Sequence, residues 1–272
     1  MSVKVLRDGR VRLWLEPDDR GLAYGDGVFE TLRVHRGQPV WWREHWDRML
    51  RGAQVLGLPV PDQMLVRREC ENLLLGSEDA VLKMILTRGS GGRGYGAPAN
   101  ATPTVILSTH PLPTPELQPV TLRWCQTTLA VQPLLAGIKH LNRLEQVLAR
   151  AEWNDPEIFD GIVCDSEDRV VGATSANVFA LIGGHWLTPR VVRCGVAGTV
   201  RAWVLANVAS AAEAELSAAE VSRADALFLC NALRGILAVR QLGLREWNQH
   251  GAVALLQKQL ADFHPAFEMQ EL

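Results

Sequence analysis

Hydrophobic residues recur at helical spacing in two segments of the N-terminal half. Residues 43–56 place Trp46 and Met49 on one side of a helix, and Gly57 follows as a stop signal. Residues 62–75 show a similar periodicity. The pattern predicts an amphipathic helix followed by a second helix.

Short runs rich in β-branched and aromatic residues predict strands around these helices. The turn signals Asp8-Gly9 and Arg36-Gly37 each separate two such runs and predict hairpins. The expected strands are residues 3–6, 11–15, 28–34, 38–42, 80–87 and 104–108. The first half of the chain is therefore expected to have an α+β fold.

The second half mixes strands and helices without a regular βαβ repeat. Expected strands are residues 120–125, 161–165, 177–182, 185–187 and 226–230, and expected helices are residues 141–153 and 198–210. Four prolines between His110 and Pro119 favour an extended connector. We therefore expect a smaller N-terminal domain (1–109), a linker (110–119) and a larger C-terminal domain (120–272), in a mixed α/β protein.

Charge and composition make small molecules the expected partners of this chain. Lys and Arg total 28 against 30 Asp and Glu, without blocks of like charge, which argues against nucleic-acid or membrane-surface binding. The apolar stretches are too short to span a bilayer, and the N-terminus does not resemble a signal peptide. Five widely spaced cysteines without metal-ligand spacing favour buried thiols in a reducing compartment, so we expect a cytoplasmic protein without a metal site.

Lys139 is the first candidate for chemistry. It lies between the apolar-rich residues 129–138 and the expected helix of residues 141–153. Partial burial there would favour the neutral amine, which is the nucleophilic form of lysine. On residue chemistry alone this signal is weak, because most lysines are solvated surface charges.

Three glycine-containing or small-residue segments are candidates for binding a flat, anionic ligand. Residues 172–179 combine small side chains with hydroxyl groups, residues 195–201 place glycines before a helix, and residues 230–235 follow a strand. Free amide N–H groups at such positions bind phosphate. Ordinary surface turns and a plain helix start are the alternatives.

These segments, together with two upstream ones, resemble the fold type IV family of pyridoxal-phosphate (PLP) enzymes, which is branched-chain aminotransferase-like. The upstream marks are Tyr-Gly-Asp-Gly-Val-Phe-Glu at residues 24–30 and Glu-His-Trp-Asp-Arg at residues 44–48. The resemblance covers residues 21–239 and implies a two-domain fold of the D-amino-acid aminotransferase type. It implies that Lys139 carries PLP as the catalytic residue. The other cofactor-binding residues it implies are Arg48, Gly172, Ser175, Ala176, Asn177, Val196, Thr199, Val200, Asn231, Ala232 and Leu233.

Particular roles follow from the same resemblance. Arg48 would bind the PLP phosphate through its planar guanidinium. Backbone amides of Thr199, Val200, Ala232 and Leu233 would complete the phosphate site. Val196 would pack on the pyridine ring, and residues 175–177 would line the cofactor edge.

Two strings narrow the resemblance to the aminodeoxychorismate lyases of folate and 4-aminobenzoate biosynthesis. They are Thr-Arg-Gly-Ser-Gly-Gly-Arg-Gly-Tyr at residues 87–95 and Lys-His-Leu-Asn-Arg-Leu-Glu-Gln at residues 139–146. The implied substrate-binding residues are Tyr24, Phe29, Arg88, Arg93 and Tyr95. Solvent-exposed loop charges are the alternative interpretation of Arg88 and Arg93.

Gly172 departs from the family pattern, in which a glutamate at this position pairs with the pyridine nitrogen. Without that carboxylate the ring is a weaker electron sink. Expulsion of pyruvate also creates an aromatic ring, which supplies driving force that transamination lacks. We therefore hypothesise that Gly172 marks an enzyme biased toward elimination.

The resemblance also implies a homodimer and a reaction in which Lys139 removes the C4 proton of the substrate. The acid that protonates the departing pyruvate stays open. The alternative functions are a fold type IV aminotransferase acting on D- or branched-chain amino acids, and a PLP-binding protein without catalysis.

Overall fold

The computed structural model describes residues 2–116 and 118–268 and divides into two compact units. Unit 1 contains Met1–Pro113 and Ile138–Asn142, and unit 2 contains Thr114–Gly137 and Arg143–Leu272. The segment that carries Lys139 thus packs with unit 1, although it follows the proline-rich connector in sequence. The division of the chain into independently folding domains stays a prediction.

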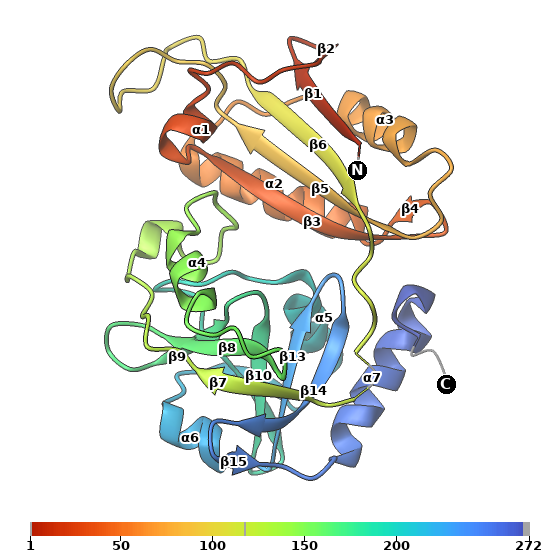
Figure 1. Ribbon diagram of the computed structural model, residues 1–272, viewed down its shortest axis with the longest axis vertical. Coiled ribbons are helices and arrows are strands. Elements are labelled where there is room, and N and C mark those ends of the chain that lie inside the picture. The colour runs from red at the N-terminus through yellow and green to blue at the C-terminus, as the bar shows by residue number, and fades with distance from the viewer. Residues whose placement is uncertain (1, 117, 269–272) are drawn as a thin grey trace. The chain divides into compact units, whose positions relative to one another are not determined.

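Unit 1 is built on an antiparallel sheet in the order β2-β1-β6-β5-β3-β4 (Figure 1). Both predicted hairpins are confirmed: Asp8 and Gly9, like Arg36 and Gly37, have positive φ angles between paired strands. The strands of unit 1 are β1 (Val3–Arg7), β2 (Arg10–Arg12), β3 (Gly27–His35), β4 (Gln38–Pro39), β5 (Ala80–Thr87) and β6 (Thr104–His110).

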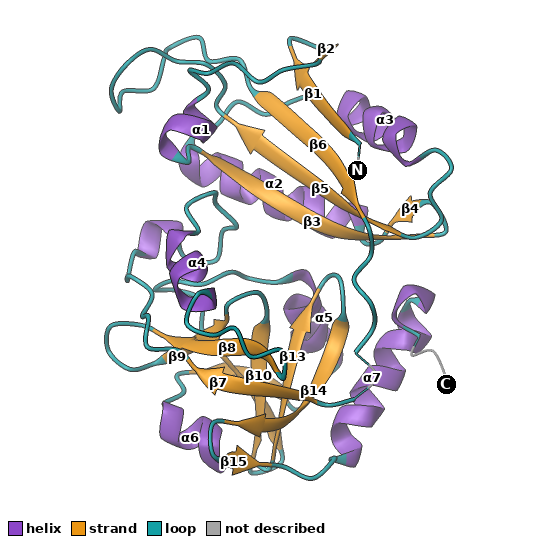
Figure 2. Cartoon of the chain, viewed as in Figure 1, coloured by secondary structure: helices purple, strands orange, loops and turns teal. Residues whose placement is uncertain are grey.

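Three helices accompany this sheet: α1 (Arg20–Tyr24), α2 (Trp42–Leu56) and α3 (Gln63–Leu74). Helix α2 lies along one face of the sheet (Figure 2), where Trp46 and Met49 join a core with Leu32, Leu82 and other strand residues. From Val28 onward, even-numbered residues of β3 are buried and odd-numbered ones only partly, as expected for a strand with one covered face. The side chains that alternate with this core are therefore available to a site.

Unit 2 contains a larger mixed sheet in the order β12-β11-β10-β13-β14-β7-β8-β9, with β15 paired to β14. Its core joins apolar residues of β7, β10, β13 and β14. The strands are β7 (Val120–Trp124), β8 (Ile158–Cys164), β9 (Val170–Ala173), β10 (Asn177–Ile182), β11 (His185–Pro189), β12 (Ala211–Ala214), β13 (Ala226–Asn231), β14 (Gly235–Leu242) and β15 (Arg245–Glu246).

The helices of unit 2 are short apart from α7, which packs beside β14 (Figure 1). They are α4 (Leu144–Arg150), α5 (Thr199–Asn207), α6 (Ala218–Arg223) and α7 (Gly251–Phe263), with 3₁₀ turns η1 (Pro133–Leu135) and η2 (Pro265–Phe267). No helix among the described residues is long and apolar enough to cross a membrane. The mixed α/β fold class predicted from the sequence is confirmed.

Some expected boundaries were wrong. The helix expected over residues 141–153 begins only at Leu144, because residues 139–141 pair with β3 and the side chain of Asn142 donates to the carbonyl of Gly25. The strand expected over residues 38–42 stops at Pro39, since Trp41 adopts a left-handed conformation before α2. The second hairpin strand ends at Arg12 rather than at residue 15.

Candidate functional site

Lys139 is fixed in unit 1 by backbone pairing with the start of β3. The amide of Phe29 donates to the carbonyl of Lys139 at 2.9 Å, and the amide of Leu141 donates to Gly27 at 3.0 Å. The Nζ of Lys139 lies 4.3 Å from the centroid of the Phe29 ring. A lysine whose own carbonyl and following residues are fixed by main-chain bonds presents its amine at a defined place, as covalent catalysis requires.

A buried ion pair lies on the opposite face of β3, where Glu30 meets two residues of α2. Its Oε1 accepts from Nε of Arg48 at 2.8 Å, and its Oε2 accepts from Nη2 of Arg48 at 2.5 Å. Nδ1 of His45 lies 2.6 Å from the same Oε2. Arg48 is therefore oriented by a two-pronged contact to a carboxylate with no exposed surface.

The charges of this cluster are set by its burial. Burial raises the pKa of Glu30, but the charge and hydrogen bonds of Arg48, aided by His45, lower it to about 2. Burial lowers the pKa of His45, and the carboxylate of Glu30 offsets this only in part. At neutral pH the cluster therefore holds one carboxylate, one guanidinium and a neutral imidazole that donates from Nδ1.

Arg88 is buried in unit 1 rather than extended from its loop. It donates to both oxygens of Asp26, at 2.7 and 3.1 Å, and to the carbonyls of Leu56 and Gly57, each at 2.7 Å. These bonds use four of its five N–H groups. Burial raises the pKa of Asp26, but bonds and charge from Arg88 and Arg20 lower it more. Arg88 therefore has one N–H group left that could donate to a substrate, and the expected contact of Arg88 with substrate stays a prediction.

The other substrate-binding candidates of unit 1 lie at the surface. Arg93 is exposed and, within the described part of the chain, has no hydrogen bond or ion pair. Tyr95 is 88% exposed, and its ring meets Tyr24 edge-on at 5.6 Å between centroids. Arg93 is thus a cation that none of the described acidic residues neutralises.

Lys83 was missed by the sequence analysis. It lies on β5, and its Nζ is 5.5 Å from the same Phe29 ring that Lys139 contacts. None of the described acidic residues pairs with it. The alternation of β5, in which Lys83 falls between buried Leu82 and Met84, was the available signal. It brings a second ammonium to the face of the sheet that carries Lys139.

In unit 2 the start of α5 has the features of an anion site. No side chain caps this helix, whose N-cap residue is Gly198. The hydroxyl of Thr199 is buried without a hydrogen-bond partner among the described residues, and the residue is 8% exposed. First-turn amides and an unpartnered hydroxyl together fit a phosphate group.

Asn177 ties this helix start to the neighbouring loop. Its Nδ2 donates to the carbonyl of Val196 at 2.9 Å, and its Oδ1 would lie 2.2 Å from a Cβ atom at position 198. Only glycine therefore fits at 198 without movement. The structure brings together three predicted residues here: Asn177, Val196 and Thr199.

The turn after β13 differs from expectation. The amide of Leu233 donates to Oδ1 of Asn231 at 3.0 Å, and the amide of Arg234 donates to the same atom at 2.9 Å. Asparagine side chains close such turns readily. The amide of Leu233 is therefore engaged within the turn, and the phosphate contacts expected of Ala232 and Leu233 stay predictions.

Asp160, which the sequence analysis did not single out, organises the segment from Gly172 to Asn177. This buried residue of β8 accepts from the hydroxyl of Thr174 at 2.5 Å and from that of Ser175 at 2.7 Å. Gly172 lies in β9 opposite Val163, and a Cβ there would be 3.0 Å from the carbonyl of Ala176. A charged residue within a buried strand was the signal for Asp160.

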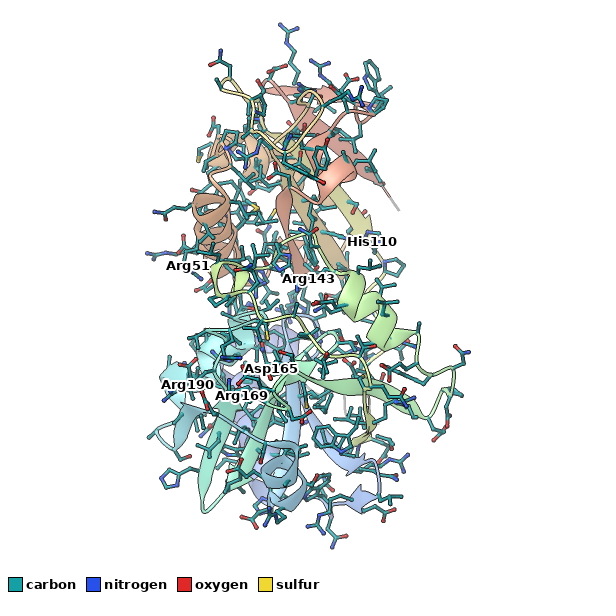
Figure 3. The ribbon with its side chains drawn as sticks, turned by 90° about the vertical axis from the view of Figure 1, so that its left-hand side faces the viewer. Arg51, His110, Arg143, Asp165, Arg169 and Arg190 are labelled. Atoms are coloured by element: carbon teal, nitrogen blue, oxygen red, sulfur yellow. The ribbon has the colours of Figure 1, made fainter. Side chains whose placement is uncertain are left out.

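A surface hollow of unit 2 lies apart from the predicted residues. It is lined by Asp165, Arg169 and Arg190 (Figure 3), together with Arg193 and others. Arg169 pairs with Glu167 and Glu215, and Arg193 pairs with Asp165 and Glu167. Because most of its charge is neutralised internally, we assign it no ligand.

The predicted residues thus form two groups, one in each unit. Unit 1 holds Lys139, Phe29 and Arg48 on adjacent elements, with Tyr24 and Tyr95 in contact nearby. Unit 2 holds the residues around the start of α5 and those of the segment anchored by Asp160. This ordered set extends over most of the chain, as does a match to the family model for amino-transferase class IV, which spans residues 27–242.

The chain belongs to the amino-transferase class IV family.

Individual members of this family are similar over nearly the whole chain. Aminodeoxychorismate lyase of Vibrio harveyi is 35% identical over 84% of this chain and 87% of that protein. The crystal structure of 4-amino-4-deoxychorismate lyase from Pseudomonas aeruginosa is 44% identical, covers 95% of this chain and 98% of that one, and has a TM-score of 0.89. A putative 4-amino-4-deoxychorismate lyase of Legionella pneumophila is 26% identical over 92% and 96%, with a TM-score of 0.85.

More distant class IV structures share the fold. A hypothetical aminotransferase from Mycobacterium tuberculosis, solved in a PLP-bound form, is 21% identical over 95% of this chain and 97% of that one, with a TM-score of 0.78. The family therefore combines one fold with both aminotransferase and lyase members, so the fold alone does not distinguish the two activities.

Proposed function

We propose that this chain is a PLP-dependent lyase that converts 4-amino-4-deoxychorismate to 4-aminobenzoate and pyruvate. The observation that carries the proposal is its similarity, over nearly the full length of both chains, to the Pseudomonas aeruginosa lyase. Lys83 beside Phe29 and the exposed Arg93 supply cations for a substrate with two carboxylates.

Each unit, taken by itself, contains residues that fit a part of PLP. Lys139 is the amine to which the cofactor would attach, and Arg48, held by Glu30, is the cation for its phosphate. Within unit 2, the buried hydroxyl of Thr199, which has no partner among the described residues, and the uncapped start of α5 also fit a phosphate group. When bound, PLP supplies a carbonyl for the substrate's amino group and a ring that withdraws electrons.

The reaction requires two proton movements, and Lys139 is the residue of this chain suited to both. As a free amine it takes the proton from C4 of the substrate. It then returns a proton, directly or through water, to the departing enolpyruvyl group, which becomes pyruvate. The ring left behind becomes aromatic, so the protein needs to stabilise the negative charge that develops after loss of the C4 proton only to a small extent.

Specificity would come from cations that hold the carboxylates of the substrate. Arg93 is accessible and unneutralised, and Lys83 lies on the same sheet face as Lys139. Tyr24, Phe29 and Tyr95 add aromatic surface suited to a six-membered ring. Arg88 acts mainly through Asp26 and the main chain of α2's C-terminal end.

We further propose a cytoplasmic homodimer. All five cysteines are free thiols, which is typical of a reducing compartment.

Helix α4 exposes Leu144, Val147 and Leu148 at helical spacing, each more than half exposed, as a surface that a second copy would cover. Light scattering of the purified protein tests the dimer, and Leu148→Glu should shift it toward monomer.

Assay of the purified enzyme for 4-aminobenzoate and pyruvate from 4-amino-4-deoxychorismate tests the activity. Transfer of an amino group from D-alanine or a branched-chain amino acid, without lyase turnover, would assign the chain to the aminotransferases instead. Binding of PLP without either turnover would make it a non-catalytic PLP protein.

The assignment of Lys139 is tested separately by borohydride reduction followed by mass spectrometry of peptides. The cofactor mass should appear on the peptide containing Lys139 and be absent in Lys139→Ala. Lys83→Ala is the matched control, because it removes the other ammonium beside Phe29 and should retain the label. A label that persists in Lys139→Ala would contradict the assignment.

A further inference from the structure

Arg20, on the short helix α1, has a buried guanidinium that donates most of its hydrogen bonds to one exposed loop. It is 4% exposed, and its Nε donates to Asp26 at 2.9 Å. Its Nη1 donates to the carbonyls of Gly94 and Gly96, at 2.9 and 3.3 Å, and its Nη2 donates to Tyr95 at 3.0 Å. Three successive carbonyls of the loop between β5 and β6 are thus held by one side chain.

Further contacts strengthen this attachment. The amide of Arg20 donates to Gly89 at 2.9 Å, and the amide of Gly94 donates to the hydroxyl of Tyr24 at 3.1 Å. The guanidinium of Arg20 also lies 4.8 Å from the centroid of the Tyr24 ring. The loop of residues 89–96 is therefore attached to α1 at both of its ends.

This loop would otherwise be flexible. It contains glycines at 89, 91, 92, 94 and 96, and a Cβ at 92, 94 or 96 would meet nothing within 4 Å. Glycine-rich chain loses much conformational entropy when it is ordered. What the ordered loop presents to solvent is the unneutralised guanidinium of Arg93 and the ring of Tyr95.

The attachment point is continuous with the segment that carries Lys139. Asp26, which Arg20 contacts, lies between Gly25, whose carbonyl accepts from Asn142, and Gly27, whose carbonyl accepts from Leu141. Residues 24–27 therefore connect the loop, through direct hydrogen bonds, to Leu141 and Asn142, which follow the lysine closely in the chain.

We propose that Arg20 is a positioning residue for substrate binding: it fixes the glycine-rich loop so that Arg93 meets a carboxylate and Tyr95 meets the ring of a cyclic carboxylic acid. The proposal rests on the proposed lyase function for the identity of that acid. Ordering the loop before binding lowers the entropy that the substrate must offset, so Arg20 acts on affinity rather than on the chemical step.

Two substitutions separate this role from general loop flexibility. Arg20→Lys keeps a charge for Asp26, but its compact ammonium cannot reach three carbonyls and a carboxylate together. Gly91→Ala places a Cβ 2.8 Å from Cδ of Arg20 and so displaces the guanidinium. Gly92→Ala is the matched control, because it stiffens the adjacent residue where a Cβ meets nothing within 4 Å.

The first measurement is limited trypsin digestion of the PLP-loaded enzyme without substrate, following cleavage after Arg93 by mass spectrometry. We expect cleavage at least tenfold faster in Arg20→Lys and Gly91→Ala than in the wild type, with Gly92→Ala within twofold. Melting temperatures and cofactor absorbance identify any variant that fails to fold. If Arg20→Lys does not fold, the comparison of Gly91→Ala with Gly92→Ala decides the test. Equal cleavage in Gly91→Ala and Gly92→Ala would overturn the attachment.

The second measurement is steady-state kinetics with 4-amino-4-deoxychorismate. We expect KM to rise at least fivefold in Arg20→Lys and Gly91→Ala while kcat stays within twofold. Faster cleavage with an unchanged KM would overturn the substrate role of the attached loop. Absence of turnover in the wild type would instead reject the proposed function, while the digestion result would still decide whether Arg20 orders the loop.

Discussion

The candidate site residues of unit 1 and of unit 2 offer different chemistry. Unit 1 uses full charges that are buried and paired, as in the clusters around Glu30 and Asp26. Unit 2 uses neutral donors, namely the uncapped amides of α5, the hydroxyl of Thr199 and the amide of Asn177. A buried charge requires an opposite charge beside it, whereas a main-chain donor requires only close approach. Unit 1 should therefore be sensitive to loss of charge, and unit 2 to added volume.

The largest effect is expected from Glu30→Gln in unit 1. The amide keeps the shape of the carboxylate but leaves the guanidinium of Arg48 buried without a counter-charge. Breaking one partner of a buried ion pair costs about 3–5 kcal/mol of the free energy of unfolding. Urea denaturation measures this cost, and PLP affinity should fall as Arg48 loses its orientation.

The matched control for that prediction is Glu71→Gln on α3. Glu71 pairs with Arg67 at 2.7 Å but is half exposed, so its loss should change stability by less than about 0.5 kcal/mol. Similar losses in Glu30→Gln and Glu71→Gln would contradict the view that burial makes the unit 1 charges important.

The same pair predicts how stability depends on pH. The pKa of Glu30 is about 2 in the folded protein against 4.5 for the free group. A lowered carboxyl pKa stabilises the folded state above pH 4.5, and this contribution is lost as pH falls from 4.5 toward 2. It amounts to about 3 kcal/mol when fully present. Denaturation midpoints measured between pH 7 and pH 3 should fall less steeply in Glu30→Gln than in the wild type, and parallel curves would refute this.

Sequence patterns predicted the elements of unit 1 better than its charge pairs. The helix at residues 42–56 and the strand at residues 80–87 follow from local periodicity. The partners of Arg48 and Arg88 do not, because each pairing depends on how separate elements are packed. Glu30 alternates correctly for burial in β3, yet only the placement of α2 shows that Arg48 faces it.

In unit 2 the ordered motifs located the start of α5, but the sequence analysis missed β14 and α7. The buried residues Val253, Leu256 and Leu260 follow helical spacing, so the period of α7 was available in the sequence. Lys139 illustrates both limits. Its motif singled it out, whereas its pairing with β3 and its distance from Phe29 needed three-dimensional structure. Strand pairing between distant segments also explains why the predicted helix after Lys139 started too early.

An intermediate effect is expected from Gly198→Ala in unit 2, which changes no charge. Its Cβ would approach Oδ1 of Asn177 to 2.2 Å and displace the side chain that holds Val196. Overpacking of this kind costs about 2–3 kcal/mol, and PLP affinity measured by absorbance titration should fall with it. Gly251→Ala is the control, since a Cβ there meets nothing within 4 Å and should leave stability equal or higher by about 0.4–1 kcal/mol. Equal PLP affinity in the two variants would contradict the idea that the unit 2 site depends on the close approach of the main chain at residue 198 to Asn177.

The smallest effect on stability is expected at Gly172 of unit 2, where a charged side chain would replace a hydrogen. Gly172→Glu places the family's usual carboxylate in β9, and its Cβ would lie 3.0 Å from the carbonyl of Ala176, at a cost of about 1 kcal/mol. Gly172→Ala carries the same Cβ contact without the carboxylate and isolates the electrostatic effect. If the absence of a carboxylate at position 172 biases the enzyme toward elimination, only the glutamate variant should form more pyridoxamine phosphate per lyase turnover, measured by absorbance. A partition ratio equal in the two variants would mean that elimination is favoured by aromatisation of the substrate alone, and that the absence of charge at position 172 has no part in it.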